Sequence, residues 1–179
     1  LMDHLDSGRE WDLVRKNGGL HIFPPYVEKT SKPFVGRVGA LAGILDFLRD
    51  QKEKYVVMAD TNGVVNFDFN RMLKAHMESG ADVTVVYNEQ ELPESLLKST
   101  ANDKGFYYTF NLENGRVTRM FVNPRESGVQ NFSMNIFMVD RELLIDLVNK
   151  AFVHGMEYFE RDVLMPRLNK LNVQAYKYE

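Results

Sequence analysis

The sequence predicts an α/β domain in which helices cover a largely parallel sheet. Two short apolar runs typical of buried strands, KYVVMA and ADVTVVYN, begin at Lys54 and Ala81. An amphipathic helical pattern lies between them, and another precedes them. A strand, a helix and a second strand in this order form a βαβ unit, which places both strands in one sheet.

Helical spacing runs without a break from Val38 to Leu48, because apolar residues recur there every three or four positions. Gly39 and Gly43 fit small positions for close helix packing. The helix between the two strands has an apolar face made of Phe69, Met72, Leu73, His76 and Met77. Asp68, directly before it, is typical of an N-cap. His76 on this face predicts a hydrogen-bonded core histidine rather than a metal ligand.

The second half of the chain predicts a hairpin, a strand, two helices and a terminal strand. Asn114-Gly115 between two strand-like runs is a hairpin signal. The run FSMNIFMVD is the next strand, and its Asp140 is placed to cap the following helix. A last helix is expected around Tyr158 to Leu168, before the terminal strand.

Length and composition indicate one globular domain. Of the 179 residues, 44% are hydrophobic and 26% charged, so the chain can bury a sizeable core. A formal net charge of −3 gives no electrostatic reason to expect nucleic acid or an anionic membrane as a partner. No apolar run approaches the ~20 residues that cross a bilayer, and no signal peptide opens the chain. Absence of cysteine excludes disulfides and thiolate zinc sites, and fits a cytoplasmic protein.

Both ends of the sequence have the pattern of interrupted elements. LMDHLDSG, from Leu1 to Gly8, is typical of the last turns of a helix. NVQAYKYE is strand-like and stops abruptly at Glu179. We therefore expect a piece of a longer chain, cut at both ends.

The sequence contains no G-x-S-x-G elbow and no glycine-rich phosphate loop, and its histidines lack metal-ligand spacing. Polar residues remain after the first strand, where α/β proteins usually bind ligands: Asp60, Asn62 and Asp68. Together with Asp162 from a late helix, a carboxylate of this loop could hold Mg²⁺. Spacing alone favours simpler roles, an N-cap for Asp68 and a solvated ion pair with Arg161 for Asp162.

The order of motifs resembles the ADP-glucose pyrophosphorylases, the glucose-1-phosphate adenylyltransferases of bacterial glycogen synthesis. The segments LMDHLDSGREWDL and GGLHIFPPY are similar to the family's H-x-x-x-G-x-x-W-D-L and G-G-x-x-I-L-P-P, and ENGRVTRMFVNP, FSMNIFMVD and YFERDVLMP continue the likeness over nearly the whole chain. The resemblance implies a Rossmann-like nucleotide-diphospho-sugar transferase domain with a mixed, mainly parallel sheet. Residues 1–179 would be part of that domain, without its glycine-rich βα unit and without the β-helix domain that follows.

The resemblance also implies a chemistry, the transfer of the α-phosphate of ATP to glucose-1-phosphate with Mg²⁺. The family's metal aspartate lies six residues before the aspartate that opens the next helix. Counting back from Asp68 places Asn62 there, and Asp60 would serve only with a two-residue insertion. Asn123 stands where the family has the lysine that meets the sugar phosphate. Asp162 matches the second metal aspartate.

Further departures fall at positions that the family uses for sugar and nucleotide. Asn135 replaces the glycine of S-M-G after Ser133, Arg37 replaces the threonine of G-T-A, and Glu160 replaces the glycine of F-G-K-D. Arg161 keeps a basic residue. The resemblance implies that Ser133, Asn135, Glu160 and Arg161 are vestiges of a sugar- and nucleotide-binding site.

This pattern is most similar to the GlgD-type subunit, a regulatory and catalytically weak or inactive paralogue. The resemblance implies a partner, the catalytic subunit, in a hetero-oligomer that is a tetramer at full length. Two alternatives stay open. One is an active glucose-1-phosphate adenylyltransferase with Asp60 and Asp162 on Mg²⁺; the other is a protein that binds a sugar phosphate or nucleotide as an effector.

Overall fold

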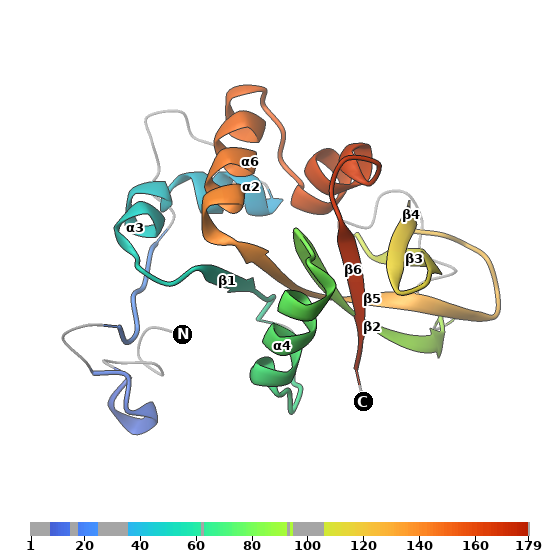
Figure 1. Cartoon of the computed structure of the whole chain (residues 1–179), viewed down its shortest axis with the longest axis horizontal. Coiled ribbons are helices and arrows are strands. Elements are labelled where there is room, and N and C mark those ends of the chain that lie inside the picture. Colours follow the sequence, from blue (N-terminus) through green and yellow to red (C-terminus); the bar gives the residue numbers. More distant parts are fainter. Residues whose placement is uncertain are drawn as a thin grey trace. The chain divides into compact units, whose positions relative to one another are not determined.

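The computed structural model describes residues 8–14, 18–24, 36–61, 63–92, 94 and 106–178 (Figure 1). The chain divides into two units, Leu1–Phe34 and Val35–Glu179. The described residues of the first include one 3₁₀ turn, η1 (Arg9–Trp11), between the left-handed residues Gly8 and Asp12. The helix expected before Gly8 lies outside the described residues.

The second unit is built on one six-stranded sheet (Figure 1). Its strands are β1 (Tyr55–Met58), β2 (Val83–Glu91), β3 (Tyr108–Glu113), β4 (Arg116–Val122), β5 (Val129–Asp140) and β6 (Val173–Lys177). Their order in the sheet is β1-β5-β2-β6-β4-β3. The predicted α/β class and the predicted placement of β1 and β2 in one sheet are therefore confirmed, and the predicted strand FSMNIFMVD lies in the same sheet as part of β5.

The expectation of a mainly parallel sheet is wrong for the described strands. Only β2 and β6 pair in parallel, and every other pairing is antiparallel. Strands β1 and β2 run in the same direction, as a βαβ unit requires, but β5 lies between them and pairs antiparallel with both. An apolar run reports burial on both faces of a sheet, not strand direction, so the sequence pattern could not show this insertion.

The hairpin of β3 and β4 turns at Asn114 and Gly115 as predicted, with φ values of 50° and 80°. It also closes part of the sheet on itself, which the sequence pattern did not show. Strand β3 pairs with the first half of β5 at Asn131 and Phe132, while β4 meets β6 at Arg116. Strands β5, β2, β6, β4 and β3 thus form a closed ring.

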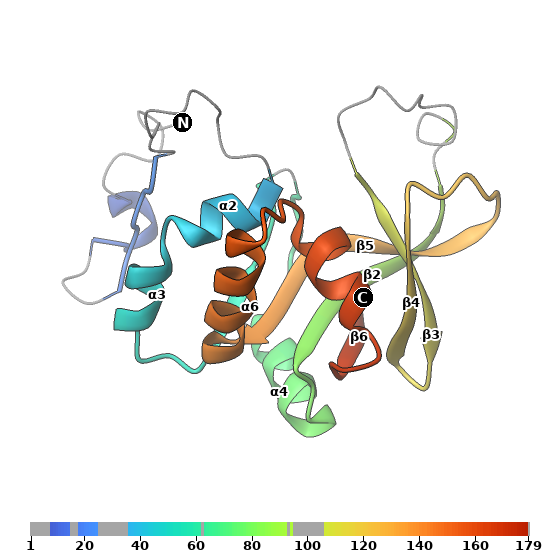
Figure 2. The same cartoon turned by 90° about the horizontal axis from the view of Figure 1, so that it is seen from above.

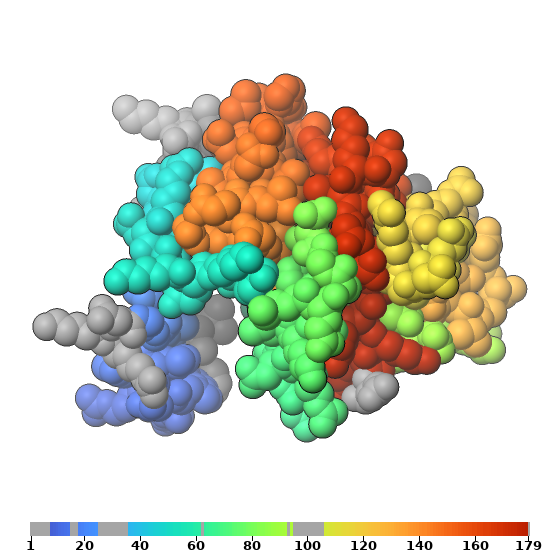
Figure 3. Space-filling model, in the orientation of Figure 1, coloured from blue at the N-terminus to red at the C-terminus, as the bar shows by residue number. Residues whose placement is uncertain are grey.

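Helices cover both faces of the sheet (Figure 2). Helices α2 (Gly36–Ala42), α3 (Leu45–Asp50) and α6 (Arg141–Val153) contribute to one hydrophobic cluster, and α4 (Phe69–Ser79) to the other. Alternate residues of β5 enter the two clusters, Phe137 and Val139 the first, Ile136 and Met138 the second. The space-filling view shows α4 lying beside β6 (Figure 3). No helix in the described ranges is long and apolar enough to cross a membrane.

The predicted caps and the core histidine are confirmed. Asp68 accepts hydrogen bonds from the N–H groups of Asn70 and Arg71, and Asp140 caps α6 in the same way. His76 is 2% exposed, and its Nδ1 lies 2.7 Å from Thr84 Oγ1. Burial lowers the pKa of His76.

Two helix predictions need correction. The helix expected without a break from Val38 interrupts at Gly43 and Ile44, where glycine weakens helical order. Residues of both α2 and α3 still belong to the first cluster, Val38 from α2 and Leu45 and Leu48 from α3. The last helix is not regular: η2 (Phe159–Leu164) is a π-helix, followed by the 3₁₀ turn η3 (Met165–Arg167).

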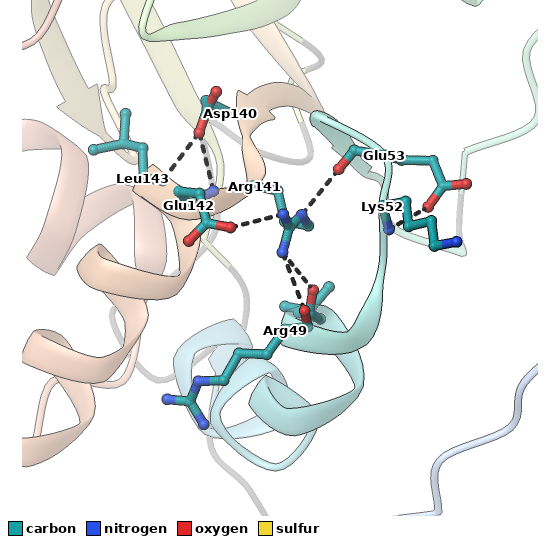
Figure 4. Close-up of polar contacts among 8 residues, drawn as sticks. Arg49, Lys52, Glu53, Asp140, Arg141, Glu142 and Leu143 are labelled. Atoms are coloured by element: carbon teal, nitrogen blue, oxygen red, sulfur yellow. Dashed lines mark hydrogen bonds and ion pairs between the residues drawn. The ribbon is translucent and has the colours of Figure 1, made fainter.

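Arg141 ties α3 to the junction of β5 and α6 (Figure 4). Its Nε donates to the carbonyl oxygen of Glu53 at 2.9 Å, and its Nη1 to that of Leu48 at 3.1 Å. The Leu48 carbonyl lies in the last turn of α3, where it also accepts the backbone N–H of Gln51 at 3.3 Å. Nη2 makes an ion pair with the exposed side chain of Glu142.

Substitutions at Arg141 and Glu142 should distinguish the hydrogen bonds of Arg141 to backbone carbonyls from its ion pair with Glu142. Arg141→Met should lower the free energy of unfolding by about 1.5–3 kcal/mol, because charged hydrogen bonds to partly buried carbonyls are lost. Glu142→Gln removes only an exposed ion pair and should cost less than ~1 kcal/mol. Urea unfolding of the two variants measures both values, and equal losses would contradict the assigned role of Arg141.

Candidate functional site

Two adjoining cavities form a cleft at the end of β1. Their volumes are about 480 Å³ and 510 Å³, and they share Ala59, Asp60, Phe106 and Asn135. Aromatic and amide side chains line the rest of the larger one, among them Tyr107, Phe132, Asn88 and Gln90. The cleft opens where an α/β sheet usually binds its ligand, at the carboxyl end of a strand.

Arg37 in α2 lies in the smaller cavity, between two carboxylates. Its Nη2 donates to Asp60 Oδ1 at 2.5 Å, and its Nη1 lies 2.8 Å from Glu160 Oε1. Nη1 is buried and makes no hydrogen bond of acceptable angle, so its contact with Glu160 is an ion pair only. The guanidinium also stands 5.0 Å from the ring centre of Phe137. Arg37 is thereby fixed by contacts on several sides.

Glu160 belongs to η2 and is 6% exposed. Burial raises the pKa of its carboxyl group, while the nearby charge of Arg37 opposes that rise. Tyr108, also in the smaller cavity, has a raised pKa because it is buried and close to Glu160. Glu160 and Tyr108 are both buried, so this part of the cleft is poorly solvated.

Asp162 hydrogen-bonds to the backbone at the start of η2. Its Oδ2 accepts the backbone N–H groups of Glu157 at 3.1 Å and Tyr158 at 2.9 Å. Arg161 donates to both of its oxygens, at 2.6 Å and 3.1 Å. The Arg161 hydrogen bond is the main reason that the pKa of Asp162 falls to about 2, and the backbone bonds add to it.

Asp162 and Asp60 line different cavities, since Asp162 faces a neighbouring hollow with Gly155, Met156 and Met165. Arg161 lies beside it and stacks on the aromatic wall of the cleft, 4.5 Å from the ring centre of Tyr158. The other vestige residues lie in the cleft itself: Ser133, Asn135 and Glu160.

Asn135 stands in a bulge of β5, where three residues oppose one residue of β2. Its φ of 54° is left-handed, a conformation that glycine and asparagine adopt most readily. Its N–H donates to Ser133 Oγ at 3.1 Å. Asparagine, where the resemblance implies glycine, is compatible with this left-handed backbone and adds a polar side chain to the cleft.

Asn123 has a structural role at the end of β4. Its φ is 48°, its Oδ1 accepts the N–H of Tyr107 at 2.9 Å, and its own N–H donates to the Tyr107 carbonyl at 2.9 Å. It does not line either cavity of the cleft. Asn62 lies outside the described residues, so its position as the counterpart of the metal aspartate stays a prediction.

The described carboxylates, as they stand, do not fit a shared Mg²⁺ site. Arg37 already neutralises Asp60, and four N–H contacts occupy the oxygens of Asp162. Within the described ranges, no three His, Cys, Asp or Glu side chains are grouped so that they could hold a metal ion. The assignment of these aspartates as metal ligands stays a prediction.

Sequence reasoning singled out Arg37 and Glu160 as separate departures and missed that they pair. Opposite charges at two positions that are both unusual for the resembled family were the available signal. The aromatic wall of Phe106, Tyr108 and Tyr158 was missed entirely, because aromatic residues in strands and loops are more often part of the core.

The chain is similar in sequence to several known proteins. A protein-family model described as nucleotidyl transferase matches residues 2–176. The glycogen biosynthesis protein GlgD of Bacillus subtilis is 31% identical over 93% of this chain and 49% of that protein. GlgD of Geobacillus stearothermophilus is 37% identical over 56% of this chain and 30% of its own length. Glucose-1-phosphate adenylyltransferase of Desulforamulus reducens is 27% identical over 93% and 37%. The chain therefore spans less than half of each of these relatives.

The pKa of Asp162 predicts a pH-dependent contribution to stability. A folded-state pKa of about 2, below the ordinary 3.8, stabilises the fold above about pH 4, and this contribution disappears as the pH falls toward 2. Asp162→Asn should therefore cost about 1–2 kcal/mol near pH 7 and progressively less below pH 4. Asp146→Asn, which removes an exposed pair with Lys150, should cost under ~1 kcal/mol at every pH. Denaturant unfolding from pH 7 to pH 2.5 compares them; a pH-independent loss in Asp162→Asn would refute the assignment.

Placing the family's lysine at position 123 should destabilise the protein. Asn123→Lys loses the side-chain bond to Tyr107 and puts a long side chain in a left-handed conformation, for an expected cost of about 2–3 kcal/mol. Asn123→Gly loses the same bond without the backbone strain and should cost less. Thermal unfolding of the pair separates strain from hydrogen bonding, and a glycine variant that is the less stable of the two would contradict this account.

Proposed function

This chain belongs to the nucleotidyl transferase family, and we propose that it is part of a regulatory, catalytically weak or inactive subunit of glucose-1-phosphate adenylyltransferase in glycogen biosynthesis. The partner would be the catalytic subunit, in a hetero-oligomer that is a tetramer at full length. The likeness to two GlgD proteins supports the pathway.

The observation that carries the regulatory assignment is the engagement of Arg37 by both Asp60 and Glu160. Nucleotidyl transfer accumulates negative charge on phosphate oxygens, which metal ions and free basic side chains stabilise. Among the described residues that line the two cavities, Arg37 is the only basic one, and it is already paired. Asp60 is likewise paired, so neither side chain supports phosphate chemistry as it stands.

A second candidate function keeps one observation in its favour. Asp60 lines the cleft at the end of β1. An active glucose-1-phosphate adenylyltransferase in which Asp60 binds Mg²⁺ would require this position. A third proposal, binding of a sugar phosphate or nucleotide as an effector, is compatible with the amide and aromatic lining of the larger cavity. Both are testable on the same protein.

The full-length protein, purified without its catalytic partner, should form ADP-glucose at least ~10³-fold more slowly than the catalytic subunit, because loss of two charge-stabilising contacts costs several kcal/mol in the barrier. Adding it to the catalytic subunit should change kcat or KM of that subunit. Pyrophosphate release from ATP and glucose-1-phosphate measures both quantities.

Asp60→Asn and Asp68→Asn form a matched pair for this assay. Asp68 caps α4, and asparagine caps nearly as well, so its replacement controls for general effects on this loop. If the full-length protein alone turned over at the rate of an ordinary enzyme, and Asp60→Asn but not Asp68→Asn abolished that rate, the active-enzyme alternative would stand.

A further inference from the structure

Arg37 joins two walls of the cleft that come from distant parts of the chain. Asp60 follows β1, Glu160 lies in η2, and Arg37 itself belongs to α2. The guanidinium lies within 2.8 Å of a carboxylate oxygen of each partner. Two carboxylates thus converge on one positive charge that the chain itself supplies.

Because Glu160 is buried, its carboxylate needs the positive charge of Arg37 beside it. The side chain of Glu160 is 8% exposed and that of Arg37 15%, whereas that of Asp60 is 39% exposed. A buried carboxylate needs a compensating cation or must become neutral. The guanidinium meets that need for Glu160 through the ion pair between Nη1 and Oε1 at 2.8 Å.

We propose that Arg37 is an internal cation that keeps divalent metal ions, and ligands that need such ions, out of the cleft. Mg²⁺ and Mn²⁺ prefer anionic oxygen ligands, and the oxygens of Asp60 and Glu160 that face Arg37 are of this kind. While the guanidinium lies between them, a metal ion meets both a positive charge and an occupied space. Removing that charge should uncover a metal site made by these two carboxylates and water.

The inference concerns the same cleft as the proposed function, and it takes from that function only the location of the site. Its test measures metal binding and thermal stability, not turnover or partner binding. A full-length protein that proved catalytic would therefore leave the metal measurements to decide the role of Arg37 by themselves.

The experiment titrates the full-length protein and its variants with Mn²⁺, and follows free Mn²⁺ by electron paramagnetic resonance. Arg37→Met, which keeps an unbranched apolar stem but removes the charge, should bind Mn²⁺ at least tenfold more tightly than the unchanged protein. Arg37→Lys retains a cation and should gain nothing. Adding Asp60→Asn or Glu160→Gln to Arg37→Met should remove the gain.

Arg161→Met is the matched control. It also frees a carboxylate from an arginine, but Asp162 still accepts two backbone N–H groups, so no tighter Mn²⁺ binding is expected. Arg37→Gln provides a second neutral variant in case Arg37→Met does not fold. For Arg37→Met and Arg37→Gln, the rise in Tm with added Mn²⁺ should be larger than that of the unchanged protein, because a ligand that binds only the folded state stabilises it. For Arg161→Met the rise in Tm should equal that of the unchanged protein.

Two results would overturn the proposal. One is Mn²⁺ binding by the unchanged protein that is as tight as in Arg37→Met and is lost in Asp60→Asn. The other is a folded Arg37→Met or Arg37→Gln protein whose Mn²⁺ affinity and Tm response match those of the unchanged protein.

Discussion

The insertion of β5 between β1 and β2 is the constraint on which the second unit depends. This strand pairs with β2 along one edge and with β1 and β3 along the other. Its alternate side chains enter both hydrophobic clusters. Its bulge at Asn135 forms part of the cleft, Phe137 lies under the guanidinium of Arg37, and Asp140 begins α6. A one-residue slip of β5 would exchange the two sets of core residues and displace the cleft wall.

The shape of the cleft and its charges have separate origins in this chain. Its walls are backbone bulges, aromatic rings and helix starts, all of which are fixed by packing and hydrogen bonds. Its charged groups contact one another, as Arg37 does with Glu160. A fold does not by itself determine function, so the role of the cleft depends on the side chains that line it.

The sequence predicted the parts of the fold that depend on local pattern. Caps at Asp68 and Asp140, the turn at Asn114 and the buried His76 follow from residue type and spacing, and the structure confirms them. The antiparallel place of β5 and the closed ring depend on contacts between distant segments, which periodicity does not report. The pairing of Arg37 with Glu160 is missed for the same reason, since 123 positions separate the two residues.

Three asparagines with left-handed backbones, Asn114, Asn123 and Asn135, also affect the unfolded chain. Glycine would adopt these conformations with less strain, but it would give the unfolded ensemble more conformations to lose on folding. Asparagine reduces the conformational entropy of the unfolded chain relative to glycine, at the cost of some backbone strain in the folded state. At Asn135 the consequence is a cleft wall whose shape is set before any ligand arrives, so that a ligand that fits it would bind without having to order the backbone there.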